Sequence, residues 1–89
     1  MKKKQIHYMS DEKISLKAKG LLALLLILPD EADKSVKALG EYCTDGPTSI
    51  LNGLRELEEL GYIERGRLRD ISGTMGPVYI QAKNTRVEG

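Results

Sequence analysis

The 89-residue chain contains no phenylalanine and no tryptophan, and its aromatic residues are four tyrosines. A core must therefore be built from Leu, Ile, Val and Ala, a composition that favours helices. One cysteine, Cys43, excludes a disulfide within the chain and fits a reducing, cytoplasmic environment. We expect Cys43 to be a small core side chain.

With one cysteine and one histidine, His7, the chain offers no set of zinc ligands. The same shortage leaves no nucleophile, base and orienting group from which a catalytic site could be assembled, and no phosphate-binding glycine loop is present. We therefore expect no enzymatic activity, no cofactor, no metal and no small-molecule ligand.

Long hydrophobic runs are also missing. The longest, "GLLALLLIL", has nine residues from Gly20 to Leu28 and is stopped by Pro29, whereas a membrane-spanning helix needs roughly 20. A secretory signal is disfavoured because Asp11 and Glu12 interrupt the approach to the run and no small-residue cleavage site follows it. The sequence favours a buried central helix and no membrane association.

Neither sign of charge dominates, since 14 basic and 13 acidic residues give a net charge of +1. Basic residues do cluster, with three lysines among the first four residues and three arginines between positions 65 and 69. We divide the chain into a basic tail and short extended segment (1–14), one domain (15–82) and a frayed tail (83–89).

Two helices are predicted in the first half of the domain. Ser15 is the expected N-cap of a helix over 16–28, which Pro29 ends. This helix is apolar around nearly its whole circumference past Gly20, so we expect other elements to enclose it. Ser35 is the expected N-cap of a shorter helix over 36–43, with Val36, Leu39 and Cys43 on one face.

A third helix is predicted over 47–60, with Pro47 in its first turn and Gly61 as its left-handed stop. An apolar stripe along it comprises Ile50, Leu54, Leu57 and Leu60, and the opposite side carries Thr48, Asn52, Arg55 and Glu59.

From residue 62 the pattern alternates, which predicts a strand over 62–69, a turn-rich segment over 70–77 and a second strand over 78–82. Two helices, a glycine-containing turn, a third helix and a hairpin indicate a winged helix-turn-helix. The predicted class is mainly α with a small β-hairpin (α+β), with three helices and a wing sheet of two or three strands.

The segments "ISLKAKGLLALLL…LPD", "SVKALGEYCTDG" and "ILNGLRELEELGYIERGRLRDISG" resemble the N-terminal winged-helix domain of bacterial plasmid and phage replication initiator (replisome organiser) proteins. The resemblance covers about residues 13–80. It implies a DNA-binding module acting at an origin or operator, often at the front of a longer initiator. At Pro47, Thr48 and Leu51 similar proteins tend to carry polar or basic residues, so this chain departs from the pattern there.

The third helix is the expected DNA-reading element. Thr48 and Ser49 stand at its start, where hydroxyls and unpaired amides can hold a phosphate. Asn52 is suited to an adenine edge, and Arg55 to a guanine or a phosphate. The acidic residues at 56, 58 and 59 restrict contact to the first two turns. The alternative is an ordinary solvated helix face.

Arg65, Arg67 and Arg69 alternate, so a regular strand would project all three from one face toward a wing tip at 72–76 that includes Thr74. This pattern predicts a clamp on the DNA backbone. The alternative is an exposed strand whose arginines pair with Glu64 or Asp70. The lysines at positions 2 to 4 are either an arm for the minor groove or a solubilising tail.

The predicted partner is double-stranded DNA, bound by a homodimer or as one domain of a longer initiator. A transcriptional regulator of the same fold is an alternative function. A second alternative is a protein-interaction module without DNA binding, which docks or dimerises through half-exposed Leu51 and the exposed half of the helix at 16–28.

Overall fold

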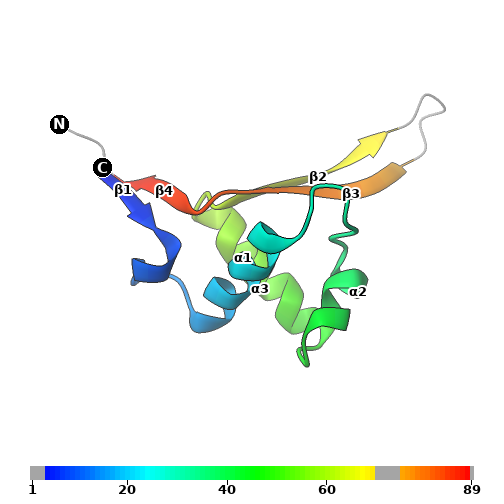
Figure 1. Cartoon of the computed structure of the whole chain (residues 1–89), viewed down its shortest axis with the longest axis horizontal. Coiled ribbons are helices and arrows are strands. Elements are labelled where there is room, and N and C mark those ends of the chain that lie inside the picture. The colour runs from blue at the N-terminus through cyan, green and yellow to red at the C-terminus, as the bar shows by residue number, and fades with distance from the viewer. Residues whose placement is uncertain (1–3, 70–74, 89) are drawn as a thin grey trace.

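Three α-helices and two small antiparallel sheets form the described part of the chain, residues 4–69 and 75–88, in the computed structural model (Figure 1). The α+β class predicted from the sequence is confirmed. The elements, in chain order, are β1 (Lys4–His7), the 3-10 turn η1 (Tyr8–Ser10), α1 (Leu16–Ile27), α2 (Val36–Leu39), the 3-10 turn η2 (Gly40–Tyr42), α3 (Pro47–Glu59), β2 (Ile63–Arg69), β3 (Met75–Ala82) and β4 (Thr85–Glu88).

Helix α1 begins as predicted, because the Ser15 hydroxyl accepts a hydrogen bond from the backbone N–H of Ala18 at 3.1 Å. The expectation that other elements enclose this helix was wrong. Its buried side chains are Ala18, Leu22 and Leu25, whereas Leu16 is 85% exposed and Ile27 is 80% exposed. In the described structure α3 and the sheet cover one side of α1, so the apolar residues on the opposite side remain exposed.

The second helix is shorter than predicted. Ser35 caps α2 by accepting from the N–H of Ala38, but the α-helix ends at Leu39 and continues as the single turn η2. Leu39 is fully buried, whereas Cys43 is exposed, so the prediction of Cys43 as a core residue was wrong. The change to the tighter 3-10 turn rotates Cys43 out of the register of a continuous α-helix.

Helix α3 matches its prediction closely. Pro47 occupies the first turn, and Gly61 adopts a φ of 87° just after the end of the helix. The inner stripe of Ile50, Leu54 and Leu57 is buried. Gly53 lies at the approach to α1, since a Cβ there would come 2.9 Å from a Leu21 methyl group. The Leu21 side chain of α1 therefore packs directly against the backbone of α3 at this point.

Strands β2 and β3 form the predicted hairpin, from Ile63 paired with Ala82 to Arg67 paired with Val78. Strand β3 begins at Met75, three residues before the predicted start at 78, so the turn predicted over 70–77 was too long. The register shifts between Arg67 and Arg69, so the strict alternation assumed for the arginines is interrupted there. In Figure 1 the two strands run along the helices and extend beyond them.

The terminal segments pair with each other. Strand β1 lies antiparallel to β4, with Lys4 opposite Glu88 and His7 opposite Thr85. The expectation of a frayed tail over 83–89 was therefore wrong for Thr85–Glu88. The extended segment predicted within residues 1–14 is confirmed as β1, and β1 and β4 lie together on one side of the molecule (Figure 1).

Candidate nucleic-acid interface

The outer face of α3 carries the side chains that the sequence singled out for reading DNA. Thr48, Asn52 and Arg55 are all exposed, on successive turns opposite the buried stripe of the helix. Amphipathic packing fixes this orientation, because Ile50, Leu54 and Leu57 turn the polar residues outward. The arrangement presents an amide and a guanidinium, which can both pair with base edges.

Two of the three acidic side chains expected to repel phosphate are bound within the chain. Glu56 accepts hydrogen bonds from the backbone N–H of Ser15 at 2.6 Å and from its hydroxyl at 3.0 Å. Glu58 accepts from Arg65 at 3.2 Å. Glu59 is exposed on the last turn. Negative charge on the outer face is therefore concentrated at the C-terminal end of α3.

The N-terminal end of α3 already has a carboxylate beside it. Its N-cap residue, Gly46, has no side chain to bond the first amides. The hydroxyl of Ser49 donates to Asp45 Oδ2 at 2.9 Å. Ser49 is thus engaged by an acidic neighbour, which weakens the case for a phosphate at this helix end compared with the sequence-based expectation. Thr48 is exposed beside it.

Arg65, on the hairpin, is paired with an acidic residue of α3. Its Nε atom forms an ion pair with Glu58 at 3.2 Å, with 24% of the arginine side chain exposed. The sequence suggested Glu64 or Asp70 as possible partners and missed Glu58, because a contact between α3 and the next strand is not visible in local spacing. The ion pair fixes the hairpin against the C-terminal half of α3.

The structure does not describe the side chains of the other two arginines predicted to contact DNA. Arg67 and Arg69 have their backbones in β2, but their side chains lie outside the described residues, as do Thr74 and the lysines at positions 2 and 3. Lys4 belongs to β1. Leu51 is half-buried at the side of α3, as its position about 100° from Ile50 predicted.

A buried polar network that the sequence did not reveal lies at the terminal sheet. The Asp11 carboxylate accepts from Arg86 Nε at 2.6 Å and Nη2 at 3.2 Å, from the Tyr62 hydroxyl at 2.7 Å, and from the backbone N–H of Lys13 at 2.9 Å. Arg86 Nη2 also donates to Glu88 at 2.8 Å. Asp11 is 2% exposed and Arg86 is 8% exposed. The network joins β4, the hairpin base and the segment before α1.

These contacts shift the titration of the network. The hydrogen bond from Arg86 holds the pKa of Asp11 well below its usual range, and the same bond raises the pKa of Arg86. Burial, reinforced by the bond to Asp11, raises the pKa of Tyr62 to about 12. Asp11 and Arg86 are satisfied by each other, so we assign this network to the fold and not to a binding surface.

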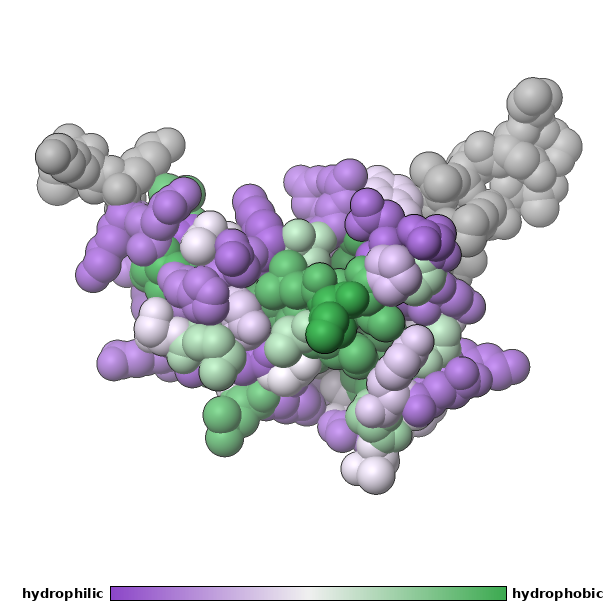
Figure 2. All heavy atoms as spheres, viewed as in Figure 1, coloured by the Kyte–Doolittle hydropathy of each residue, from purple (hydrophilic) through white to green (hydrophobic). Residues whose placement is uncertain are grey.

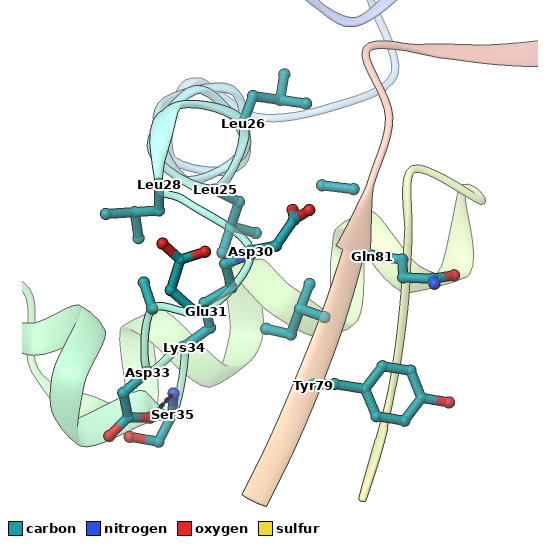
Figure 3. Close-up of a pocket in the computed structure, with 13 residues that line it drawn as sticks. Leu25, Leu26, Leu28, Asp30, Glu31, Asp33, Lys34, Ser35, Tyr79 and Gln81 are labelled. Carbon is teal, nitrogen blue, oxygen red and sulfur yellow. Dashed lines mark hydrogen bonds between the residues drawn. The ribbon is translucent and has the colours of Figure 1, made fainter. Parts of the chain in front are cut away.

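A broad recess lies between the segment following α1 and strand β3 (Figure 3). Its volume is about 1050 Å³, and its lining combines the leucines at the end of α1 with Asp30, Glu31 and Asp33. Asp33 accepts from the backbone N–H of Ser35 at 2.9 Å, which is the bond drawn in Figure 3. Among the described residues no cluster of His, Cys, Asp and Glu has the arrangement of a metal site.

None of the described helices has the length and apolar character needed to cross a membrane. Comparison of the chain with protein-family models, with curated proteins and with solved structures finds no match to any of them.

Proposed function

We propose that the chain is a winged helix-turn-helix module that binds double-stranded DNA with α3 and the β2–β3 hairpin, in replication initiation of the plasmid or phage type. The observation that carries the proposal is the outer face of α3, where Thr48, Asn52 and Arg55 are exposed on successive turns. A helix presenting such a face after a tight turn is the element that enters the major groove in helix-turn-helix proteins.

The neighbourhood of α3 supports this proposal. The hairpin follows the helix directly, and the Arg65–Glu58 ion pair holds the two together. Glu56, on the third turn, accepts two hydrogen bonds from Ser15. The first two turns of α3 contain no acidic residue, and the nearby Asp45 carboxylate is engaged by Ser49. The replication role rests on the sequence resemblance alone, and a transcriptional regulator would use the same surface.

A salt titration tests DNA binding. We expect the affinity for a mixed-sequence duplex to fall as salt rises, with a log–log slope of about 0.9 for each phosphate neutralised. Amide NMR shifts should concentrate at 47–55 and on the hairpin. Absence of binding at low salt, or shifts confined to other surfaces, would contradict the proposal.

Two substitutions separate base reading from backbone contact. Asn52→Ala should change the preference among DNA sequences, by about 1–3 kcal/mol at one base pair. Arg55→Ala should lower affinity for all sequences if the guanidinium binds phosphate, and should reduce the salt slope by about 1. Lys83→Ala removes an exposed cation between β3 and β4 and serves as the control, which should change neither quantity.

A further inference from the structure

The side of α1 opposite the core is an apolar surface that the described part of the chain leaves uncovered. Along this side lie Leu16, Gly20, Ala23 and Ile27, which we call the outer stripe of α1. At about 100° per residue these four positions fall within an arc of about 60°. Figure 2 shows apolar residues gathered over α1 at the centre of this view.

The two large side chains of the stripe are almost fully in solvent, with Leu16 85% and Ile27 80% exposed. Single exposed leucines are ordinary on protein surfaces. Leu16 and Ile27 lie at the two ends of the stripe, about 16 Å apart along the helix axis, and the exposed Gly20 and Ala23 continue the apolar surface between them. Beside the stripe, a groove of about 360 Å³ opens between α1 and η2 and is lined by Leu24 and Tyr42 among others.

Gly20 has no role in the packing of the described chain. A Cβ built at Gly20 meets nothing within 4 Å, whereas one at Gly53 would come 2.9 Å from Leu21. Glycine inside a helix costs about 1 kcal/mol relative to alanine. The close approach of α1 therefore explains Gly53. No contact within the described chain explains Gly20, and its position leaves room for a second helix to approach closely.

The order of residues along the stripe is self-complementary. Leu16 and Ile27 lie equally far from its midpoint, and so do Gly20 and Ala23. When two copies of α1 cross antiparallel about a two-fold axis at this midpoint, Leu16 faces Ile27 of the other copy and Gly20 faces Ala23. Small residues then stand where the helix axes are closest, and large ones at both ends. This is the isologous pattern of a two-fold dimer.

Charge also favours an antiparallel pairing. Lys17 is exposed beside the N-terminal end of the stripe, and Glu31 is exposed just past the C-terminal end of α1 (Figure 3). Antiparallel crossing brings each lysine toward the glutamate end of the other copy, and it also opposes the helix dipoles favourably. Lys19, at the edge of the stripe, donates its Nζ to the Met9 carbonyl of the same chain at 3.1 Å.

We infer that the outer stripe of α1 is a homodimer interface, occupied by α1 of a second copy of this chain in antiparallel orientation. The partner's Ile27 lies against Leu16 and Gly20, at the end of the stripe where the groove opens. The inference does not depend on DNA binding, and its test contains no DNA, so the two proposals fail separately.

The test measures the mass of the 89-residue chain by sedimentation equilibrium from micromolar to millimolar concentration. We expect a monomer–dimer equilibrium with no larger species. Ala23→Arg places a charge at the crossing point and should keep the chain monomeric at concentrations at least tenfold above those that dimerise the parent. Asn52→Arg, the same addition on the outer face of α3, should dimerise normally, and circular dichroism establishes that both variants are folded.

A charge exchange tests the orientation. Lys17→Glu and Glu31→Lys should each weaken the dimer about fivefold, and the double variant, which restores the parent net charge, should return to within about twofold of the parent. Lys83→Glu changes the net charge as Lys17→Glu does and should have no such effect. A parent chain that stays monomeric, an Ala23→Arg chain that still dimerises, or a double variant no tighter than either single variant would overturn the inference.

Discussion

Two polar regions of this molecule use similar side chains in opposite ways. At the terminal sheet, Arg86 is buried and its donors are taken by Asp11 and Glu88. On the outer face of α3, Arg55 is exposed and, among the described residues, forms no ion pair with a carboxylate. A buried charge must be satisfied internally because desolvation is costly, whereas an exposed one remains available for a partner.

Arg65 is intermediate between the two. It pairs with Glu58, but about a quarter of its side chain remains in solvent. Exposed ion pairs contribute little to stability because water and salt screen them. Arg86, Arg65 and Arg55 are therefore increasingly exposed and decreasingly paired with carboxylates. Substitutions that disturb them should lower the stability of the fold most at Arg86 and least at Arg55.

The largest effect is expected at the buried Arg86. Asp11→Ala leaves Arg86 without its main partner in a buried position, and it should lower the free energy of unfolding by about 3 kcal/mol. Arg55→Ala, the control, should change it by less than about 0.5 kcal/mol. Urea denaturation followed by circular dichroism measures both. Equal effects of the two substitutions would contradict the distinction between these regions.

Acid tests the charge of Asp11 separately from its size, because Asp11→Asn keeps the volume of the side chain. Because the pKa of Asp11 is lower in the folded state than its unfolded value of about 4, its contribution is complete above that value and is lost as pH falls below it. The melting temperature should therefore fall more steeply between pH 5 and pH 2 in the parent than in Asp11→Asn, where this carboxyl is missing. Parallel curves would assign the acid sensitivity to other groups.

A smaller effect is expected from the phenol of the network. Tyr62→Phe removes one buried hydrogen bond, while Asp11 keeps Arg86, so the cost should be about 1–2 kcal/mol. Tyr42→Phe is the matched control, since Tyr42 is 57% exposed and its hydroxyl contributes little. Because the pKa of Tyr62 is raised to about 12, its contribution holds below its unfolded value of about 10 and is lost as pH rises toward 12.

The smallest effect on stability is expected at Arg65. Glu58→Gln removes the charge opposite it and should change the free energy of unfolding by less than about 1 kcal/mol. If the proposed DNA surface is correct, the same substitution should raise affinity for a duplex a few-fold and steepen its salt dependence, because Arg65 is then available to a phosphate. Unchanged affinity would remove Arg65 from that surface.

Local signals in the sequence predicted where all three helices begin, although α2 ends at Leu39 and not at the predicted residue 43. The caps Ser15 and Ser35, the first-turn Pro47 and the left-handed Gly61 each act within a few residues, so their effects are visible in sequence order. The exposed face of α3 followed from the spacing of its buried stripe. These features need no knowledge of distant contacts.

Features that depend on distant residues were missed. Asp11 and Arg86 are 75 positions apart. An extended segment was predicted near the N-terminus, but nothing in its local pattern indicates that it pairs with residues 85–88. The apolar circumference of α1 led to the wrong prediction that other elements enclose this helix. Periodicity shows which faces of a helix are apolar and not how many neighbouring elements cover them. The winged-helix topology and the DNA-reading roles on α3 stay predictions.

The pairing of β1 with β4 also determines how the chain would respond to force. Lys4 lies opposite Glu88, so the ends of the described chain leave from the same end of one antiparallel ladder (Figure 1). Tension applied through them would act perpendicular to the strands and would break the hydrogen bonds between β1 and β4 one pair after another. Mechanical opening should therefore begin at low force and stop first at the Asp11–Arg86 pair, which is the first strong resistance that tension would meet.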